Sequence, residues 1–478
     1  MDLLKIKGIG SIMERNYERL LVVLPAVFAF LFALVPSLKY SIPLPWDIYY
    51  HIHNAMIYMD HGTVFWDPIT CAPHGRPIYY PPLFHMLLLL IVKITGISFF
   101  TVSRFIQPVM AFMIILSFSY VAERLYGGLT GFLTGVFSIS SLFFLRMIYP
   151  IPESLAVIIL PLTVYGYCRS MDPDSGAFPI ITGFFLGLMM LTHPLSASIT
   201  LAVILISTGV LWVSGRGING RNVIIIMGTG FLLSAAWYLP LIIKYGFIFR
   251  SPDSVPLNLK DYPAYFGSLL TVLATTGFAF AITRRDKRDI IMLVWALFVL
   301  LLSFGYLLGL KVLSNRILYF ALFPVATMAG TVFNSMKIMN KRWLVYLMVF
   351  LLTFFFLSGG YKVAASAKPM VSETELDVSR WFKYNGDHVT VVASDYHIQP
   401  AVVAVSRQPV SAGGYAPGSG RTINVNKYIG TFNYTGEDIK RDRVGYIILA
   451  HDTRTPPYSR MVYRNRDFVV YRVLISGT

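Results

Sequence analysis

Eleven apolar runs, each long enough to cross a lipid bilayer, constrain the fold of this chain more than any other feature of its sequence. They lie at 20–38, 104–122, 127–145, 153–168, 178–194, 196–214, 222–243, 262–282, 289–310, 317–336 and 343–359. Hydrophobic residues make up 55% of the 478 and charged residues only 13%, which excludes a soluble globular protein of this length. We therefore predict an α-helical, polytopic membrane protein with about 11 transmembrane helices.

A twelfth apolar run, at 83–96, is short for a bilayer core of about 30 Å. The distribution of basic residues decides its assignment, because cytoplasmic loops carry an excess of Lys and Arg. If the N-terminus is cytoplasmic and 83–96 does not cross, the basic loops all lie inside, including the cluster at 284–288. We therefore predict an interfacial or re-entrant helix at 83–96, in a protein of the cell membrane whose C-terminal domain is external.

The formal net charge of +16 does not indicate nucleic-acid binding, since much of the excess lies in short loops, where it sets topology and meets anionic lipid. From about residue 362 the composition changes. Residues 372–384 predict an amphipathic helix with a Ser-x-x-Glu capping box, and HVTVVAS, VGYIILAH and FVVYRVLIS predict strands. We expect a transmembrane domain at 1–361 and a small external α/β domain at 362–478.

The first external loop, residues 39–103, contains more reactive chemistry than a connector needs. Its acids and histidines are Asp47, His51, His53, Asp60, His61, Asp67, His74 and His85. Asp47 and His51 are four residues apart and would share one face of a helix. From the residues alone, two interpretations stay open. Asp47 caps a surface helix whose aromatic residues lie at the headgroup level, or the loop is the front of an active site.

The order of motifs in this loop resembles that of a known enzyme family. WDIYYHIH is followed by FWDP, then by PHGRP and by YYPPL. This pattern is similar to the first external loop of the catalytic subunit of archaeal and bacterial oligosaccharyltransferases, and more broadly to GT-C glycosyltransferases, which take sugars from polyprenyl phosphates. Ile48, His74 and Pro82 stand where the family has Pro, Leu and Gly. The resemblance implies a GT-C-like membrane domain in which 83–96 lies parallel to the membrane.

The same resemblance implies roles for individual residues of the loop. Asp47 would be the catalytic general base, or a metal ligand if a metal is used. His51 or His53 would complete the metal shell or hydrogen-bond the donor phosphate. His74 and Arg76, in the His-Gly-Arg sequence, would also bind substrate, and His51, Arg76 or Arg316 would neutralise the leaving phosphate.

Glu153, in RMIYPIPE, opens the predicted span 153–168 on its external side. Taken alone, it is an acidic residue near a helix N-terminus, where the helix dipole favours negative charge. In the resembling family this loop supplies a carboxylate to a divalent-metal site, typically as one of two acids, and only Glu153 remains here. Asp47 and Glu153 would then offer hard oxygen ligands that suit Mg or Mn.

Three further residues are candidate substrate ligands. Arg316, in LSNRILYF, is either an interfacial arginine that snorkels to the headgroups or, as the resemblance implies, a phosphate or acceptor ligand. Asp395 and Tyr396 stand where oligosaccharyltransferases carry Trp-Trp-Asp-Tyr-Gly to hold the acceptor sequon. Both tryptophans and the glycine are missing here, which favours transfer of a single sugar. Asp395 would bind an acceptor or cap the helix that follows.

The sequence thus predicts a membrane glycosyltransferase that moves a sugar from a polyprenyl-phosphate-linked donor to a lipid, glycan or protein acceptor on the external face. One alternative is an oligosaccharyltransferase that acts en bloc on protein Asn. Another is a flippase or transporter for lipid-linked sugars, which would need ionisable residues or broken helices near the midplane. A non-catalytic envelope protein is a third. The acids of this chain cluster at the external ends of the spans, which favours an enzyme.

Overall fold

The computed structural model describes residues 2–246, 254–336, 342–414, 421–451 and 454–474. The chain divides into two compact units, which are described separately. Unit 1 comprises residues 1–41, 104–236 and 251–367, and unit 2 comprises residues 42–103, 237–250 and 368–478. The first external loop therefore belongs with the C-terminal residues, whereas the sequence assigned it to the transmembrane domain.

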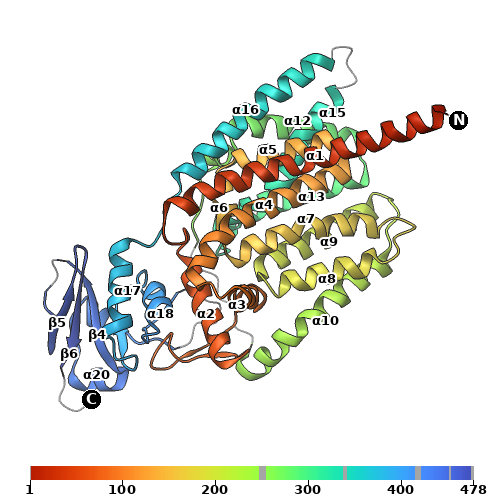
Figure 1. Cartoon of the computed structure of the whole chain (residues 1–478). Coiled ribbons are helices and arrows are strands. Elements are labelled where there is room, and N and C mark those ends of the chain that lie inside the picture. The colour runs from red at the N-terminus through yellow and green to blue at the C-terminus, as the bar shows by residue number, and fades with distance from the viewer. Residues whose placement is uncertain (1, 247–253, 337–341, 415–420, 452–453, 475–478) are drawn as a thin grey trace. The chain divides into compact units, whose positions relative to one another are not determined.

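Unit 1 is built from helices, and one helix occurs at each of the eleven apolar runs. These are α1 (Asp2–Lys39), α4 (Phe99–Tyr126), α5 (Gly128–Ser140), α7 (Pro152–Ser170), α8 (Phe178–Met190), α9 (Pro194–Val213), α10 (Gly220–Tyr245), α12 (Ser268–Arg284), α13 (Lys287–Ser303), α15 (Leu322–Met336) and α16 (Arg342–Ser366). The short helices α6 (Phe144–Ile148), α11 (Tyr262–Phe266) and α14 (Ser314–Tyr319) lie between them. Helices α4, α7, α8 and α9 run side by side with roughly parallel axes (Figure 1).

Several of these helices are long and apolar enough to span a membrane. They are Leu20–Lys39, Phe99–Tyr126, Pro194–Val213, Gly220–Tyr245 and Trp343–Ser366, with the bent pair Leu259–Phe266 and Ser268–Arg284 as a sixth if it counts as one span. Other apolar helices are shorter, among them α3 (Leu83–Thr95) at the predicted interfacial segment. The chain is a multi-pass membrane protein, and the count of eleven spans remains a prediction.

Two glycines on α5 allow close packing within unit 1. A Cβ atom on Gly131 would lie 2.6 Å from the carbonyl oxygen of Ser119 in α4, and one on Gly135 would lie 2.6 Å from the Cβ of Pro25 in α1. Small residues at a spacing of four let helix backbones approach each other in a membrane. The GLTGFLTG sequence therefore determines how tightly α1, α4 and α5 pack.

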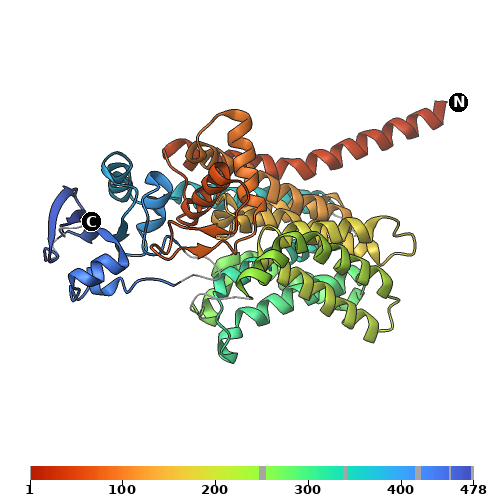
Figure 2. The ribbon, with the colours of Figure 1, turned by 90° about the horizontal axis from the view of Figure 1, so that it is seen from below.

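Unit 2 joins the first external loop to the C-terminal residues. The loop contains α2 (Asp47–His61), the paired strands β1 (Trp66–Asp67) and β2 (Arg76–Pro77), and α3. Its backbone bonds directly to a distant segment. The amide of Cys71 donates to the carbonyl of Ala412 at 3.0 Å, and the amide of Val410 donates to the carbonyl of Ile69 at 2.9 Å. The orange loop and the blue C-terminal elements lie side by side in both views (Figures 1 and 2).

The C-terminal part of unit 2 is a mixed sheet covered by helices on both faces. Its strand order is β3-β4-β6-β5, with β3 (Val391–Ala393), β4 (Val444–Ala450), β5 (Ser459–Arg464) and β6 (Phe468–Val473). Strand β3 is parallel to β4, and the other pairs are antiparallel. Side chains alternate along a strand, so Ile447 packs with Ile439 on one face while Ile448 packs with Phe382 and Val402 on the other. These contacts come from α17 (Glu373–Asn385), α18 (Gln399–Ser406) and α20 (Gly436–Asp442); the short helix α19 (Asn426–Ile429) adds Tyr428 to the first face.

Candidate active site

Asp47 lies in the first turn of α2, at the edge of a cluster formed by two distant segments of unit 2. The carboxylate is half-buried and near enough to Tyr396 for an electrostatic interaction. The adjacent Trp46 indole Nε1 donates to the carbonyl of His397 at 2.5 Å, and its ring lies 5.3 Å from that of His397 and 5.4 Å from that of Tyr396, centroid to centroid. The structure therefore brings the predicted residues Asp47 and Tyr396 together.

The turn at 395–397 is held by short polar contacts. The Asp395 carboxylate accepts a hydrogen bond from the His397 amide at 2.8 Å. The His397 ring Nδ1 lies 3.2 Å from a carboxylate oxygen of Glu375, which also completes the capping box of α17. Asp395 and Tyr396 are both exposed. The Asp395 carboxylate thus shapes the turn, while the Tyr396 side chain near Asp47 is exposed.

The predicted ligands His51 and His53 are buried and belong to two separate contacts. His53 Nε2 lies 2.9 Å from Asp67, and Asp67 also accepts hydrogen bonds from the amides of Ile69 at 3.0 Å and Thr70 at 3.2 Å. Burial alone would raise the pKa of Asp67, but His53, the Arg76 charge and Thr70 outweigh it and hold this pKa below its ordinary value. The hydrogen bonds fix the loop that follows β1.

The second contact joins α2 to α3. His51 Nδ1 lies 3.0 Å from His85 Nε2, so one ring must donate to the other. Burial lowers the pKa of His85 to about 3, and the nearby His53 adds to this effect. His85 is therefore neutral at physiological pH. The substrate-binding roles of His51 and His53 remain predictions.

Arg76 is also buried, on β2, with only 2% of its surface exposed. Its guanidinium donates to the carbonyls of Gly414 at 2.8 Å and Gly413 at 3.2 Å and lies 5.0 Å from the Tyr50 ring centroid. These contacts orient the guanidinium toward backbone of the same unit. The neighbouring His74 is exposed. Substrate binding by His74 and Arg76 remains a prediction.

A second group of charges lies in unit 1, around Glu153. Glu153 begins α7 and is 1% exposed. Arg146 Nε and Nη2 donate to its carboxylate at 2.9 and 2.8 Å, and Arg316 of α14 donates to the same carboxylate at 2.8 and 3.2 Å. His193, the N-cap of α9, interacts with Glu153 electrostatically. Two guanidinium groups share one carboxylate, so the three side chains carry a net positive charge that suits an oxyanion.

Arg146 is the functional candidate that the sequence did not identify. It lies seven residues before Glu153, and the two residues belong to different helices, so helical spacing does not predict their contact. The contact arises because α6 ends at Ile148 and the chain turns through Pro150 before α7. The available signal was Pro150, between Arg146 and Glu153. The residue before a proline is biased away from helical conformation, which indicates a turn that could bring the two side chains together.

The surroundings of Glu153 do not fit a metal ligand. Both of its oxygens accept hydrogen bonds from guanidinium groups, and a divalent cation there would lie beside two positive charges. Within the described ranges, no group of three or more His, Cys, Asp or Glu side chains could hold a metal ion. The prediction of Mg or Mn at Asp47 and Glu153 thus gains no support from the geometry, and no chemical step below uses a metal.

The fold of the chain matches solved structures of membrane glycosyltransferases. The oligosaccharyltransferase of Archaeoglobus fulgidus, in complex with Zn and sulfate, gives a TM-score of 0.72 at 14% identity over 90% of this chain and 68% of that chain. The oligosaccharyltransferase AglB of the same organism, with an inhibitory peptide and a dolichol-phosphate, gives 0.67 at 12% identity over 91% and 70%. ArnT from Cupriavidus metallidurans, bound to undecaprenyl phosphate, gives 0.66 at 12% identity over 96% and 98%.

These structures are GT-C glycosyltransferases, so the resemblance seen in the first external loop is confirmed at the level of the fold. No protein-family model matches the chain. No curated protein sequence matches it either.

Proposed function

We propose that this protein is a glycosyltransferase that moves a sugar from a polyprenyl-phosphate-linked donor to an acceptor on the external face of the membrane. The observation that carries the proposal is the shared fold, which extends over nearly the whole of this chain and of ArnT. Two of the matching structures hold a polyprenyl phosphate. A fold alone does not fix a function, so the residues of the loop must supply the chemistry.

In the proposed reaction, Asp47 acts as the general base. The acceptor hydroxyl gives its proton to the Asp47 carboxylate, and the hydroxyl oxygen attacks the anomeric carbon of the sugar. The bond from that carbon to the phosphate oxygen breaks, and the phosphate leaves with the electron pair. Asp47 is suited to this role because it is half-buried beside the exposed Tyr396. The ring of Trp46 next to it offers an apolar face for a sugar.

For the phosphate, we propose Arg316 as a ligand. Its side chain is 25% exposed, and its guanidinium donates to Glu153. Arg146 supports this arrangement, because its own bonds to Glu153 leave the cluster with excess positive charge. A bidentate guanidinium contact to a phosphate oxygen is among the stronger charge-assisted hydrogen bonds.

We further propose transfer of a single sugar rather than en bloc transfer to protein. The turn at 395–397 places Tyr396 and His397 against Trp46, where a sequon-binding site would need the absent tryptophans. This chain and ArnT are similar in length and the oligosaccharyltransferase is longer, which supports transfer of the smaller group. The acceptor itself is left open among lipids, glycans and proteins.

The test compares two aspartates of α2. Asp47→Asn removes the proposed base, whereas Asp60→Asn changes an acid that pairs with Arg407 at 2.6 Å. Purified protein in native lipid receives radiolabelled polyprenyl-phosphate sugars, and the label in new products is measured. We expect Asp47→Asn to slow transfer by about 10²- to 10⁴-fold, the usual contribution of a general base, and Asp60→Asn to retain it. Equal rates for the two variants would reject Asp47 as the base.

The same preparation separates the enzyme from the flippase. In proteoliposomes, a flippase moves labelled lipid-linked sugar across the bilayer without forming a new product. Translocation in the absence of transfer would therefore overturn the proposed function.

A further inference from the structure

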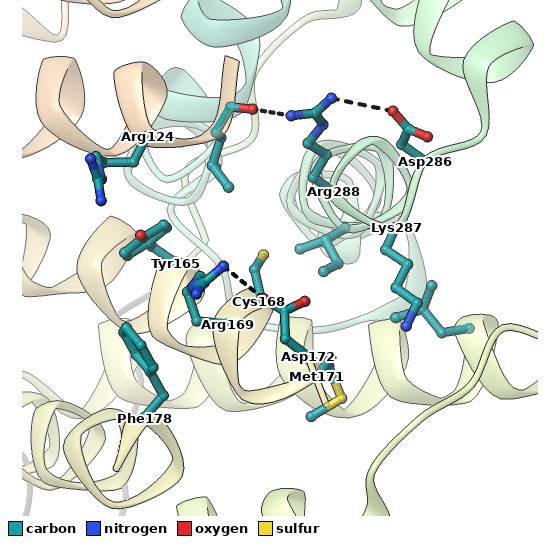
Figure 3. A pocket seen from close by; sticks show the side chains of 13 residues that line it. Arg124, Tyr165, Cys168, Arg169, Met171, Asp172, Phe178, Asp286, Lys287 and Arg288 are labelled. Carbon is teal, nitrogen blue, oxygen red and sulfur yellow. Dashed lines mark hydrogen bonds and ion pairs between the residues drawn. The ribbon is translucent and has the colours of Figure 1, made fainter. Parts of the chain in front are cut away.

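A pocket with a volume of about 720 Å³ lies within unit 1, far along α7 from Glu153. It is lined by Arg124, Leu125, Tyr165, Cys168, Arg169, Met171, Asp172, Phe178, Leu211, Asp286, Lys287, Arg288 and Ile291. These residues come from the last turns of α4, α7 and α9 and from the first turns of α8 and α13. Several helix ends therefore converge on one polar space (Figure 3).

The pocket and the Glu153 cluster lie at opposite ends of the same helix. Glu153 is in the first turn of α7 and Arg169 is in its last turn. Sixteen residues separate them, a rise of about 24 Å at about 1.5 Å per residue. That distance approaches the thickness of a bilayer core, about 30 Å, so the pocket belongs to the other membrane surface. By the predicted topology, this surface is the cytoplasmic one.

The pocket carries more positive than negative charge. Arg169 pairs with Asp172 at 2.8 Å and Arg288 with Asp286 at 3.4 Å, so each lining acid already has an arginine partner. The lining holds no further carboxylate, and outside it Glu123 interacts electrostatically with Arg124.

Arg124 and Lys287 come from different helices. Lys287 Nζ donates to a backbone carbonyl, that of Gly217, at 2.9 Å, and Arg124 interacts with the Tyr165 hydroxyl. Figure 3 shows Arg124 and Lys287 on opposite sides of the space, with Arg288 between them along one edge. An anion in this space would meet positive charge from α4 and α13 together.

We propose that this pocket binds the phosphate of an anionic phospholipid headgroup. Basic pockets between membrane helices on the cytoplasmic side are suited to such headgroups, and a volume of this size is typical of small-molecule sites. Phenylalanine, leucine and isoleucine side chains among the lining residues give the glycerol and the first acyl carbons an apolar contact. Arg124 and Lys287 attract the phosphate from two sides of the pocket. This inference does not depend on the proposed glycosyl transfer.

The experiment measures lipid binding to the full chain in nanodiscs. The nanodiscs contain phosphatidylcholine with increasing phosphatidylglycerol, and retained lipids are counted by native mass spectrometry. The pocket variant carries Arg124→Gln and Lys287→Gln. The matched control carries Arg221→Gln and Arg285→Gln, two exposed arginines that are absent from the pocket lining. We expect the pocket variant to bind phosphatidylglycerol about 25-fold more weakly, since each cation near an anionic lipid contributes about fivefold.

A charge-preserving variant, Arg124→Lys with Lys287→Arg, keeps the proposal falsifiable if the neutral variant folds poorly, and we expect it to bind as the wild type does. Equal binding by the pocket variant and the control would overturn the proposal, as would equal retention of phosphatidylcholine and phosphatidylglycerol. A parallel measurement in phospholipid-free detergent uses glycerol 1-phosphate. If this soluble ester binds as tightly as phosphatidylglycerol does, the site takes soluble phosphate esters and the lipid assignment is wrong.

Discussion

Replacing Glu153 by glutamine tests the charge cluster of unit 1 directly, because the change keeps the shape of the side chain and removes its charge. The Glu153 side chain is 2% exposed, and it accepts two hydrogen bonds from Arg146 and two from Arg316. In the variant, an amide NH₂ group replaces either Oε1, which accepts from one donor, or Oε2, which accepts from three. At least one donor loses its acceptor, and two positive charges lose the anion between them.

The expected cost follows from these contacts. Hydrogen bonds to charged groups contribute about 1.5–3 kcal/mol each, and removing one partner of a buried ion pair costs about 3–5 kcal/mol. The Arg146 and Arg316 side chains are 22% and 25% exposed, so water recovers part of their solvation in the variant. We therefore expect Glu153→Gln to lower the free energy of unfolding by about 3 kcal/mol.

The assay is urea unfolding in detergent, with and without a metal chelator. Glu373→Gln is the matched control, because the Glu373 side chain is 66% exposed and a surface change of this kind costs within about 0.5 kcal/mol. A double-mutant cycle of Glu153→Gln with Arg316→Gln should show a coupling of about 1–3 kcal/mol. A loss below about 1 kcal/mol would refute the ion-pair account. A loss that the chelator abolishes would make Glu153 a metal ligand instead.

Other predictions concern packing and pH. Arg76→Gln removes the hydrogen bonds to the Gly413 and Gly414 carbonyls and should destabilise unit 2 by about 2–4 kcal/mol in the same unfolding assay. If Arg76→Lys retained the wild-type stability, the planar guanidinium would not be required. His85, with its pKa lowered to about 3, binds a proton near pH 6.5 only when unfolded, so stability should fall by about 2 kcal/mol from pH 6.5 to pH 5. The same loss in His85→Phe would contradict this. Gly135→Leu should overpack α5 against its neighbours and cost about 1–3 kcal/mol in the unfolding assay, and an unchanged stability would refute the close approach.

The fold was largely predictable from local patterns. Apolar runs located the helices of unit 1, and the Ser-x-x-Glu signal located α17, whose capping box between Ser372 and Glu375 the structure confirms. Predicted strands correspond to β3, β4 and β6. Strand β5 was missed because SRMVYR is an edge strand with charged and exposed residues, so it lacks the apolar run of a buried strand.

The composition of unit 2 was not predictable. Backbone hydrogen bonds join residues 69–72 to residues 410–412, more than three hundred positions away. Every residue except proline has both a backbone amide donor and a carbonyl acceptor. No pattern of side chains therefore predicts which of these groups will pair. From the sequence, the first external loop was therefore assigned to the transmembrane domain that flanks it along the chain.

The candidate site was only partly predictable for a related reason. The family resemblance identified Asp47 and Tyr396, which the structure places near each other. It also identified Arg76, but a pattern of residue types does not reveal burial, and the structure shows this guanidinium committed to backbone carbonyls. Arg146 was missed because its partner lies across a turn rather than along one helix face.

The central claim is that a sugar leaves a polyprenyl phosphate on this protein, and the most direct measurement follows that sugar. Purified wild-type protein in native lipid extract receives either a radiolabelled polyprenyl-phosphate sugar or the corresponding nucleotide sugar, and label outside the donor pool is counted with time. The account predicts transfer from the lipid-linked donor alone and release of polyprenyl phosphate in equal amount. Transfer from the nucleotide sugar, or no transfer from either donor by a folded protein, would contradict it.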